Sequence, residues 1–186
     1  MSLRSLERVV GVSGKNRATN NYAKLVVANL LKKGVIQKLA KGCYTNRNDA
    51  GLAVLCFQPA YLGLQSALSF HGLWEQETIP VIITATKARQ GRRSVLGMNV
   101  VLHRIQHTLV FGVTYELDGE QYLPCSDIEK TFLDLLYFKQ NISGEVLMQF
   151  RKKVDRKKLM RYVLRYPETV RKQVRVLLNL LFPKQL

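Results

Sequence analysis

Apolar residues in the first third of the chain recur at the spacing of an α-helix. Between residues 19 and 33, one helical face carries a continuous apolar stripe. The stripe consists of Ala23, Val26, Val27 and Leu30. Thr19 or Asn20 is suited to cap the start of this helix, and Gly34 stands where a glycine commonly ends one. The pattern therefore predicts an amphipathic helix over residues 19–33.

After this glycine the pattern changes from helical to extended. The runs VIQKLA and CYTN have the character of two short strands, and Lys41-Gly42 between them suits a turn. An ordinary hairpin at a sheet edge has the same pattern, because lysine also protects exposed strand edges. A helix followed by a hairpin, here over residues 35–46, is nevertheless the layout of a winged helix-turn-helix. We therefore predict a winged helix-turn-helix DNA-binding domain at residues 1–48 and a second domain at residues 49–186.

The second domain is predicted to begin with a helix and to continue with strands. Residues 60–73 have a helical pattern with one apolar face. That face carries Tyr61, Leu64, Leu68 and His71. The runs VIITATK, NVVLHRIQ and LVFGVTYEL are rich in β-branched residues and predict strands, with a basic turn, ARQGRR, after the first. Asp118-Gly119 predicts a tight hairpin turn, so we expect a small antiparallel sheet.

The last part of the chain is predicted to be helical. Ser126 and Glu129 have the spacing of a capping box, which predicts the start of a helix. Three further helices follow over about 145–182, the second of them capped by Asp155. The predicted fold class is α+β: an N-terminal winged helix-turn-helix, then a mixed α+β domain with a small antiparallel sheet and a helical C-terminus.

The distribution of charge adds a prediction about partners. The 186-residue chain has a net charge of +16 and a pI near 10.0. Residues 1–48 hold ten lysines and arginines against one acid, residues 139–186 hold thirteen against three, and the residues between hold six against nine. Two basic ends around a slightly acidic middle indicate parts with different functions. A positive field of this size favours nucleic acid, an anionic membrane surface or an acidic protein as the partner.

Cysteine use and hydropathy bear on the location of the protein. Cys43, Cys56 and Cys125 are far apart in sequence and form no C-x-x-C motif. This argues against a disulfide framework or a zinc knuckle and for a reducing compartment. The N-terminal run MSLRSLERVV contains three charged side chains and makes a poor signal peptide, and no apolar run approaches the ~18 residues of a membrane span. We therefore expect a cytoplasmic protein with no membrane partner.

Side chains at the start of the predicted helix have the chemistry of base readout. Asparagine can pair with adenine and arginine with guanine in the major groove, although a polar, solvated helix start is the plainer interpretation. The candidate base contacts are Asn16, Arg17, Asn20, Asn21 and Lys24. We expect phosphate contacts from lysines at the helix end and in the hairpin, and from arginines of the basic turn. For the basic turn, the alternative is a hairpin tip that is simply solvated. The candidate backbone contacts are Lys32, Lys38, Lys41, Arg89, Arg92 and Arg93.

A second anionic-partner surface is predicted on the C-terminal helices. The run RKKVDRKKLMRYVLR holds eight cations and one acid, and its self-repulsion favours an anionic partner over a merely solvated face. The members singled out are Arg151, Lys152, Lys153, Lys158, Arg161 and Arg165. This surface leaves open an alternative function, an RNA-binding or ribonucleoprotein-associated protein that uses helices over residues 151–175.

Catalytic chemistry has little support in the sequence. His103 and His107 fall on strand-like sequence, and no third metal ligand is evident. Glu129 and Asp134 are a pair of carboxylates, but the capping box explains the first and pairing with a cation such as Arg104 explains the second. No phosphate-binding glycine loop, nucleophile elbow or H-E-x-x-H motif occurs. We expect a protein that is not an enzyme and needs no metal or cofactor.

Several segments together resemble the AbiEi family, antitoxin-type transcriptional regulators of abortive-infection (type IV toxin–antitoxin) systems. The resemblance covers about residues 20–138, through LLKKGVIQKLAKGCYT, YLGLQSALSFHGL, PVIITATKARQGRR, FGVTYELDG and IEKTFLDLL. It implies a winged-helix domain that binds inverted repeats of duplex DNA in its own promoter, with a homodimer as one option. It also implies a C-terminal domain that counters a nucleotidyltransferase-like toxin. The positions that match the family pattern, with structural roles, are Ser66, Ala67, His71, Gly72, Glu129 and Asp134.

Overall fold

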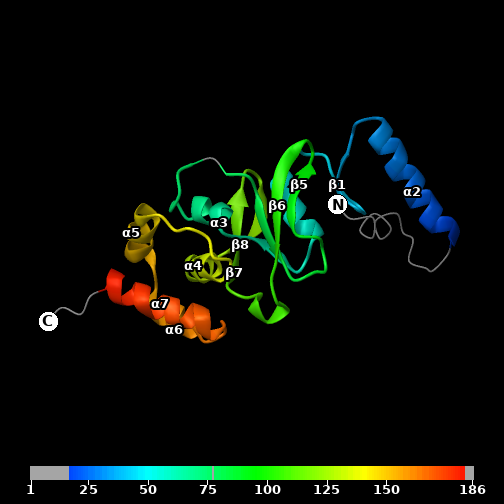
Figure 1. Ribbon diagram of the computed structural model, residues 1–186. Helices are drawn as coiled ribbons and strands as arrows, with labels where there is room; N and C mark the ends of the chain where they lie inside the picture. Colours follow the sequence, from blue (N-terminus) through cyan, green and yellow to red (C-terminus); the bar gives the residue numbers. More distant parts are fainter. Residues whose placement is uncertain (1–16, 77, 183–186) are drawn as a thin grey trace.

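A computed structural model describes residues 17–76 and 78–182 and has an α+β fold (Figure 1). Its helices are α2 (Arg17–Lys32), α3 (Gln65–Phe70), α4 (Ile128–Tyr137), α5 (Gly144–Lys153), α6 (Arg156–Val163) and α7 (Glu168–Leu181), with the 3-10 helices η1 (Ala50–Cys56) and η2 (His107–Leu109). Its strands are β1 (Gln37–Ala40), β2 (Cys43–Thr45), β3 (Ala60–Leu62), β4 (Val81–Thr84), β5 (Gly91–Val95), β6 (Met98–Arg104), β7 (Val113–Asp118) and β8 (Gln121–Ser126). The predicted α+β class is confirmed.

The central sheet has six strands in the order β5-β6-β4-β3-β8-β7. The pairs β4–β6 and β3–β8 are parallel, and the other three pairs are antiparallel. The sheet is therefore mixed and larger than the small antiparallel sheet that was predicted. The period of a strand does not encode which strand lies beside it, and the parallel partners here are not consecutive in the chain. The predicted Asp118-Gly119 turn is confirmed, because Asp118 pairs with Gln121 across the β7–β8 hairpin.

Side chains of the central strands alternate between two cores, one on each face of the sheet. Tyr61 and Ile83 belong to the first core, and Leu62 and Ile82, one residue away, belong to the second. Helices α4 to α7 cover the first face, whereas η1 covers the second, on the side from which α2 extends (Figure 1). Leu39 of β1 also belongs to the second core. The hairpin β1–β2 is therefore packed on the sheet.

One strand and one short helix, β3 and α3, replace the single helix predicted over residues 60–73. The chain changes direction at Gly63, where a Cβ would collide with the Ile83 side chain, and at Leu64, which has a φ of 52°. A short apolar run fits the period of a helix and that of a strand equally well. Pro59 and Gly63 limit the first part of the run to the length of a strand, so residues 60–62 form β3 and not the start of a helix.

The three C-terminal helices are confirmed, and so is the cap of α6, where the Asp155 carboxylate accepts from the Lys158 N–H at 3.1 Å. The start of α4 differs from the prediction. Its N-cap is Asp127, which accepts from the Lys130 N–H at 2.8 Å, and not the preceding Ser126. An aspartate one position later caps a helix as well as a serine does. None of the helices in the described part of the chain is long and apolar enough to cross a membrane.

Candidate nucleic-acid interface

Helix α2 confirms the predicted helix but begins two residues earlier, at Arg17. Thr19 and Asn20 therefore lie inside the helix and do not cap it. The predicted end is confirmed. Gly34 has a φ of 68°, in the left-handed region, and its N–H donates to the Leu31 carbonyl at 3.1 Å. This glycine turns the chain out of the helix and toward β1.

The predicted base contacts lie at the N-terminal end of α2. Asn16 is outside the described residues, and the structure describes only the helical backbone of Arg17, Asn20 and Asn21. Lys24 is the member with a described side chain, and it is exposed. Its position on the solvent side of α2 leaves it available to a ligand, and base contact by all five residues stays a prediction.

The hairpin β1–β2 has one anchored side and one open side. Its strands pair antiparallel, with Lys38 opposite Tyr44, and Gly42 in the turn has a φ of 76°. Leu39 is buried in the core behind the hairpin, whereas Lys38 and Lys41 are exposed. Burial of one residue therefore fixes the ribbon on the sheet and directs its lysines to solvent.

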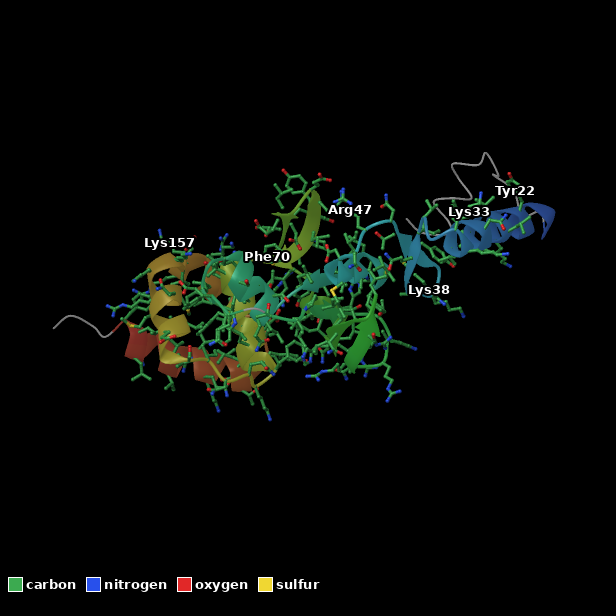
Figure 2. The ribbon with its side chains drawn as sticks, turned by 90° about the horizontal axis from the view of Figure 1, so that it is seen from above. Tyr22, Lys33, Lys38, Arg47, Phe70 and Lys157 are labelled. Atoms are coloured by element: carbon green, nitrogen blue, oxygen red, sulfur yellow. The ribbon has the colours of Figure 1, made fainter. Side chains whose placement is uncertain are left out.

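Exposed lysines gather on α2, on the residue that follows it and on the hairpin; together they are called the lysines of α2 and the hairpin. They are Lys24, Lys32, Lys33, Lys38 and Lys41. Within residues 17–76 and 78–182, none of the five forms an ion pair. Figure 2 shows Lys33 and Lys38 at one end of the molecule and Lys157 at the other. Since no described carboxylate neutralises these five charges, their positive potential extends into solvent, where it attracts phosphate groups.

Of the arginines predicted to form a basic turn, Arg92 and Arg93 lie in the edge strand β5, and Arg89 lies in the loop just before it. An edge strand tolerates exposed charges, so the polar composition of this segment did not indicate a strand. Strand β5 contacts β1 of the hairpin, which brings the two basic segments side by side (Figure 1). Arg89 and Arg92 are exposed, but Arg93 donates to the Arg89 carbonyl and lies 5.6 Å from the centre of the Phe57 ring. Two arginines therefore extend the lysine surface, and the third is held against the protein.

Part of the predicted second basic surface holds the fold together. Lys153 Nζ donates to the His71 carbonyl at 2.6 Å, and Lys158 Nζ lies 2.9 Å from Glu129 Oε2. The Arg165 guanidinium lies 4.4 Å from the centre of an aromatic ring. The remaining exposed members are Arg151, Lys152 and Arg161. This surface is on the helices that cover the opposite face of the sheet from η1, so it is separate from the lysines of α2 and the hairpin.

Lys130 and Asp134 form an ion pair that is fully buried between the sheet and the C-terminal helices. The Asp134 carboxylate also accepts from the hydroxyls of Tyr61 at 2.8 Å and Tyr166 at 2.6 Å. The Lys130 ammonium donates to the same two hydroxyls at 2.7 and 2.8 Å. Burial lowers the pKa of Lys130, and the charge of Asp134 opposes that shift. The predicted pairing of Asp134 with Arg104 is wrong, although the i, i+4 spacing of the true pair on α4 was visible in the sequence.

Glu129 has a structural partner in place of the predicted capping-box role. Its carboxylate accepts from the Asp155 N–H at 2.8 Å and pairs with Lys158, which ties α4 to the start of α6. His103 packs its ring on Phe138, with 4.9 Å between the ring centres. In the described part of the chain, no three histidine, cysteine, aspartate or glutamate side chains are placed to hold a metal ion. The carboxylates considered for catalysis are therefore engaged in packing α4.

The comparisons with known proteins add no family. No protein-family model matches this sequence, and no curated protein matches it. The lysine surface of α2 and the hairpin is therefore interpreted from its geometry and charge.

Proposed function

We propose that the chain is a DNA-binding transcriptional regulator whose N-terminal part, residues 1–48, acts as a winged helix-turn-helix. Helix α2 lies in the major groove and presents its N-terminal polar residues to base edges, while β1–β2 is the wing. The wing lysines, Lys38 and Lys41, contact phosphates and supply affinity without sequence choice. The observation that carries this proposal is the group of exposed lysines on α2 and the hairpin, which form no ion pair among the described residues.

In its finer form the proposal is an autorepressor of the antitoxin type. The resemblance to the AbiEi family implies it, with duplex DNA of the protein's own promoter as one partner and a nucleotidyltransferase-like toxin as the other. Such a regulator acts in the cytoplasm, and a homodimer would suit inverted repeats. The burial of Asp134 and the tethering role of Glu129 support a non-catalytic second domain, because neither carboxylate faces an open site.

Duplex DNA is favoured over RNA as the ligand. The RNA alternative depends on the C-terminal helices, where Lys153 and Lys158 are used for contacts within the protein. The lysines of α2 and the hairpin have no such use among the described residues. They also lie on a helix and a ribbon, the two shapes that fit the major groove and its flanking backbone.

The experiment is a titration of the full chain with a labelled duplex and with a single-stranded RNA of the same length, at the same salt concentration. We expect tighter binding of the duplex, and a footprint on the DNA upstream of the coding sequence. Lys24→Ala should weaken duplex binding, whereas Lys157→Ala, at the other end of the molecule, should not. Tighter binding of the RNA, unaffected by Lys24→Ala, would overturn the proposal and favour the C-terminal helices.

A further inference from the structure

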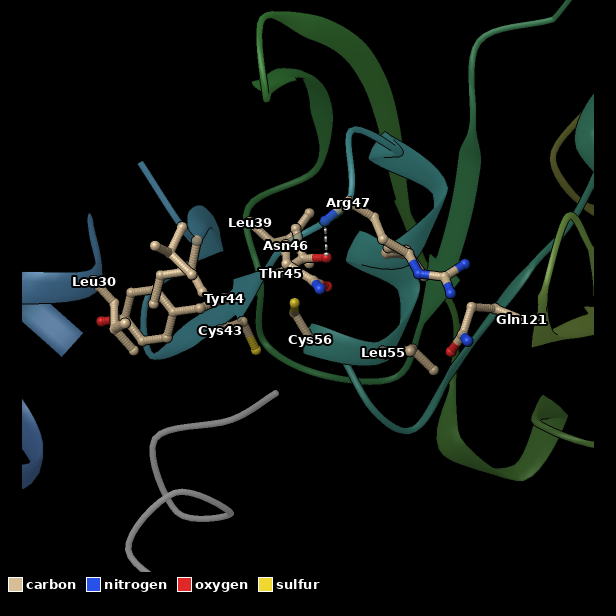
Figure 3. A pocket seen from close by; sticks show the side chains of 13 residues that line it. Leu30, Leu39, Cys43, Tyr44, Thr45, Asn46, Arg47, Leu55, Cys56 and Gln121 are labelled. Carbon is tan, nitrogen blue, oxygen red and sulfur yellow. Dashed lines mark hydrogen bonds between the residues drawn. The ribbon is translucent and has the colours of Figure 1, made fainter. Parts of the chain in front are cut away.

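Two cysteines that are far apart in sequence meet where the hairpin packs on η1. Cys43 is the first residue of β2, and Cys56 is the last residue of η1. Both thiols line one cavity of about 640 Å³ (Figure 3). The Cys43 thiol is near enough to that of Cys56 to help raise its pKa, and both thiols are free. Their spacing in sequence gave no sign of a pair, because the contact depends on how the hairpin folds back on η1.

We propose that Cys43 and Cys56 are a reversible redox pair that closes to a disulfide and ties the hairpin to η1. Two free thiols that line the same cavity can approach the S–S bond length of about 2.05 Å by rotation of their side chains. The cavity gives their side chains room to rotate and gives a small-molecule oxidant access to the sulfur atoms. Neither half-buried side chain is enclosed by the core.

The oxidant that fits this chemistry is a small-molecule disulfide such as oxidised glutathione. Burial raises the pKa of Cys56, as does the neighbouring Cys43 thiol, so Cys56 stays protonated and Cys43 makes the first attack. The Cys43 thiolate forms a mixed disulfide and releases one glutathione thiolate, which takes up a proton. Cys56 then loses its proton and attacks the Cys43 sulfur, and the second glutathione leaves as a thiol. The protein loses two electrons and two protons, and one glutathione disulfide becomes two thiols.

The third cysteine is an internal reference for this reaction. Cys125 is fully buried in the sheet, and its thiol points to the Ser126 carbonyl, 3.7 Å away. Burial raises the pKa of Cys125, so it is both inaccessible and protonated. The covalent state of the thiols can be read without any DNA, so the redox pair can fail or succeed independently of the proposed function.

The test is non-reducing peptide mapping of the full chain after incubation with oxidised glutathione. Trypsin places the three cysteines in separate peptides, residues 42–47, 48–87 and 105–130. We expect a product that links 42–47 to 48–87, the loss of two of the three free thiols, and full reversal by dithiothreitol. Cys125→Ser should give the same link, and Cys56→Ser should stop at a mixed disulfide on Cys43. Separate mixed disulfides without a link, a link to Cys125, or links between two chains would each overturn the proposal.

Discussion

The buried pair of Lys130 and Asp134 allows a quantitative test of how the second domain is held together. Lys130→Met leaves the Asp134 carboxylate fully buried, with the hydroxyls of Tyr61 and Tyr166 as its only polar partners among those described. Asp134→Leu leaves the ammonium with the same two hydroxyls. Removing one member of a buried pair typically costs about 3–5 kcal/mol of unfolding free energy, because it leaves an uncompensated charge. Asp134→Leu should lie near the lower end, since Lys130 can release its proton.

The double variant separates pairing from packing. When both charges are removed together, no isolated charge remains, so the two single losses should not add. We expect the loss in Lys130→Met/Asp134→Leu to be smaller than the sum of the singles by at least about 2 kcal/mol, within the range seen for residues in contact. Urea denaturation followed by the fluorescence of Trp74, which packs against the same core, measures all four proteins. Additive losses, or single losses below about 1 kcal/mol, would refute the reasoning.

Two further predictions concern the same domain. Burial, with the nearby charge of Asp134, raises the pKa of Tyr166 above its ordinary value of 10.0. The tyrosine's contribution to stability is therefore complete below pH 10, and it falls above pH 10 by up to about 1.4 kcal/mol per pH unit. The lowered pKa of Lys130 changes stability in the opposite sense below pH 10.5. The contribution of Tyr166 is therefore measured as the difference in unfolding free energy between the wild type and Tyr166→Phe at each pH. If the two proteins lose stability identically as the pH rises above 10, the prediction is contradicted. Gly112 and Gly119 both have positive φ, so alanine at either position costs about 1–2 kcal/mol of backbone strain. Only at Gly112 would the new Cβ also lie 2.9 Å from a tyrosine ring atom. Gly112→Ala should therefore lower the free energy of unfolding, measured by urea denaturation, by more than Gly119→Ala does. Equal losses would show that the contact is unimportant.

Local signals in the sequence were sufficient where a single residue decides the backbone. Gly34 ends α2, Gly42 allows the hairpin turn and Asp155 caps α6, each as predicted. These features depend on the conformational freedom of glycine or on a side chain that bonds its own helix. For the candidate interface, the hairpin lysines were predicted from the same kind of local pattern, because exposure on a short ribbon follows from alternation.

Features that depend on distant parts of the chain could not be predicted in the same way. The parallel pairing of β3 with β8 joins segments that share no local signal. The cavity that Cys43 and Cys56 both line likewise depends on how distant segments pack. Lys158 pairs with Glu129, so it is not available to the second basic surface. The charged sequence around Lys158 is typical of a solvated face and gave no sign of this contact. Charge in a sequence indicates a positive surface, but only the packed structure tells which cations remain free.

The central claim is that the wing lysines contact DNA phosphates, and the salt dependence of duplex binding tests it most directly. Each phosphate neutralised contributes about −0.9 to the slope of log K against log salt. Lys38→Ala/Lys41→Ala should weaken binding to all duplexes alike and make the slope shallower by about 1.8, since two contacts are lost. The matched control, Lys157→Ala/Arg161→Ala, removes two exposed charges from the C-terminal helices and should leave the slope unchanged. A wing variant with the wild-type slope, or a control that changes the slope equally, would contradict the account.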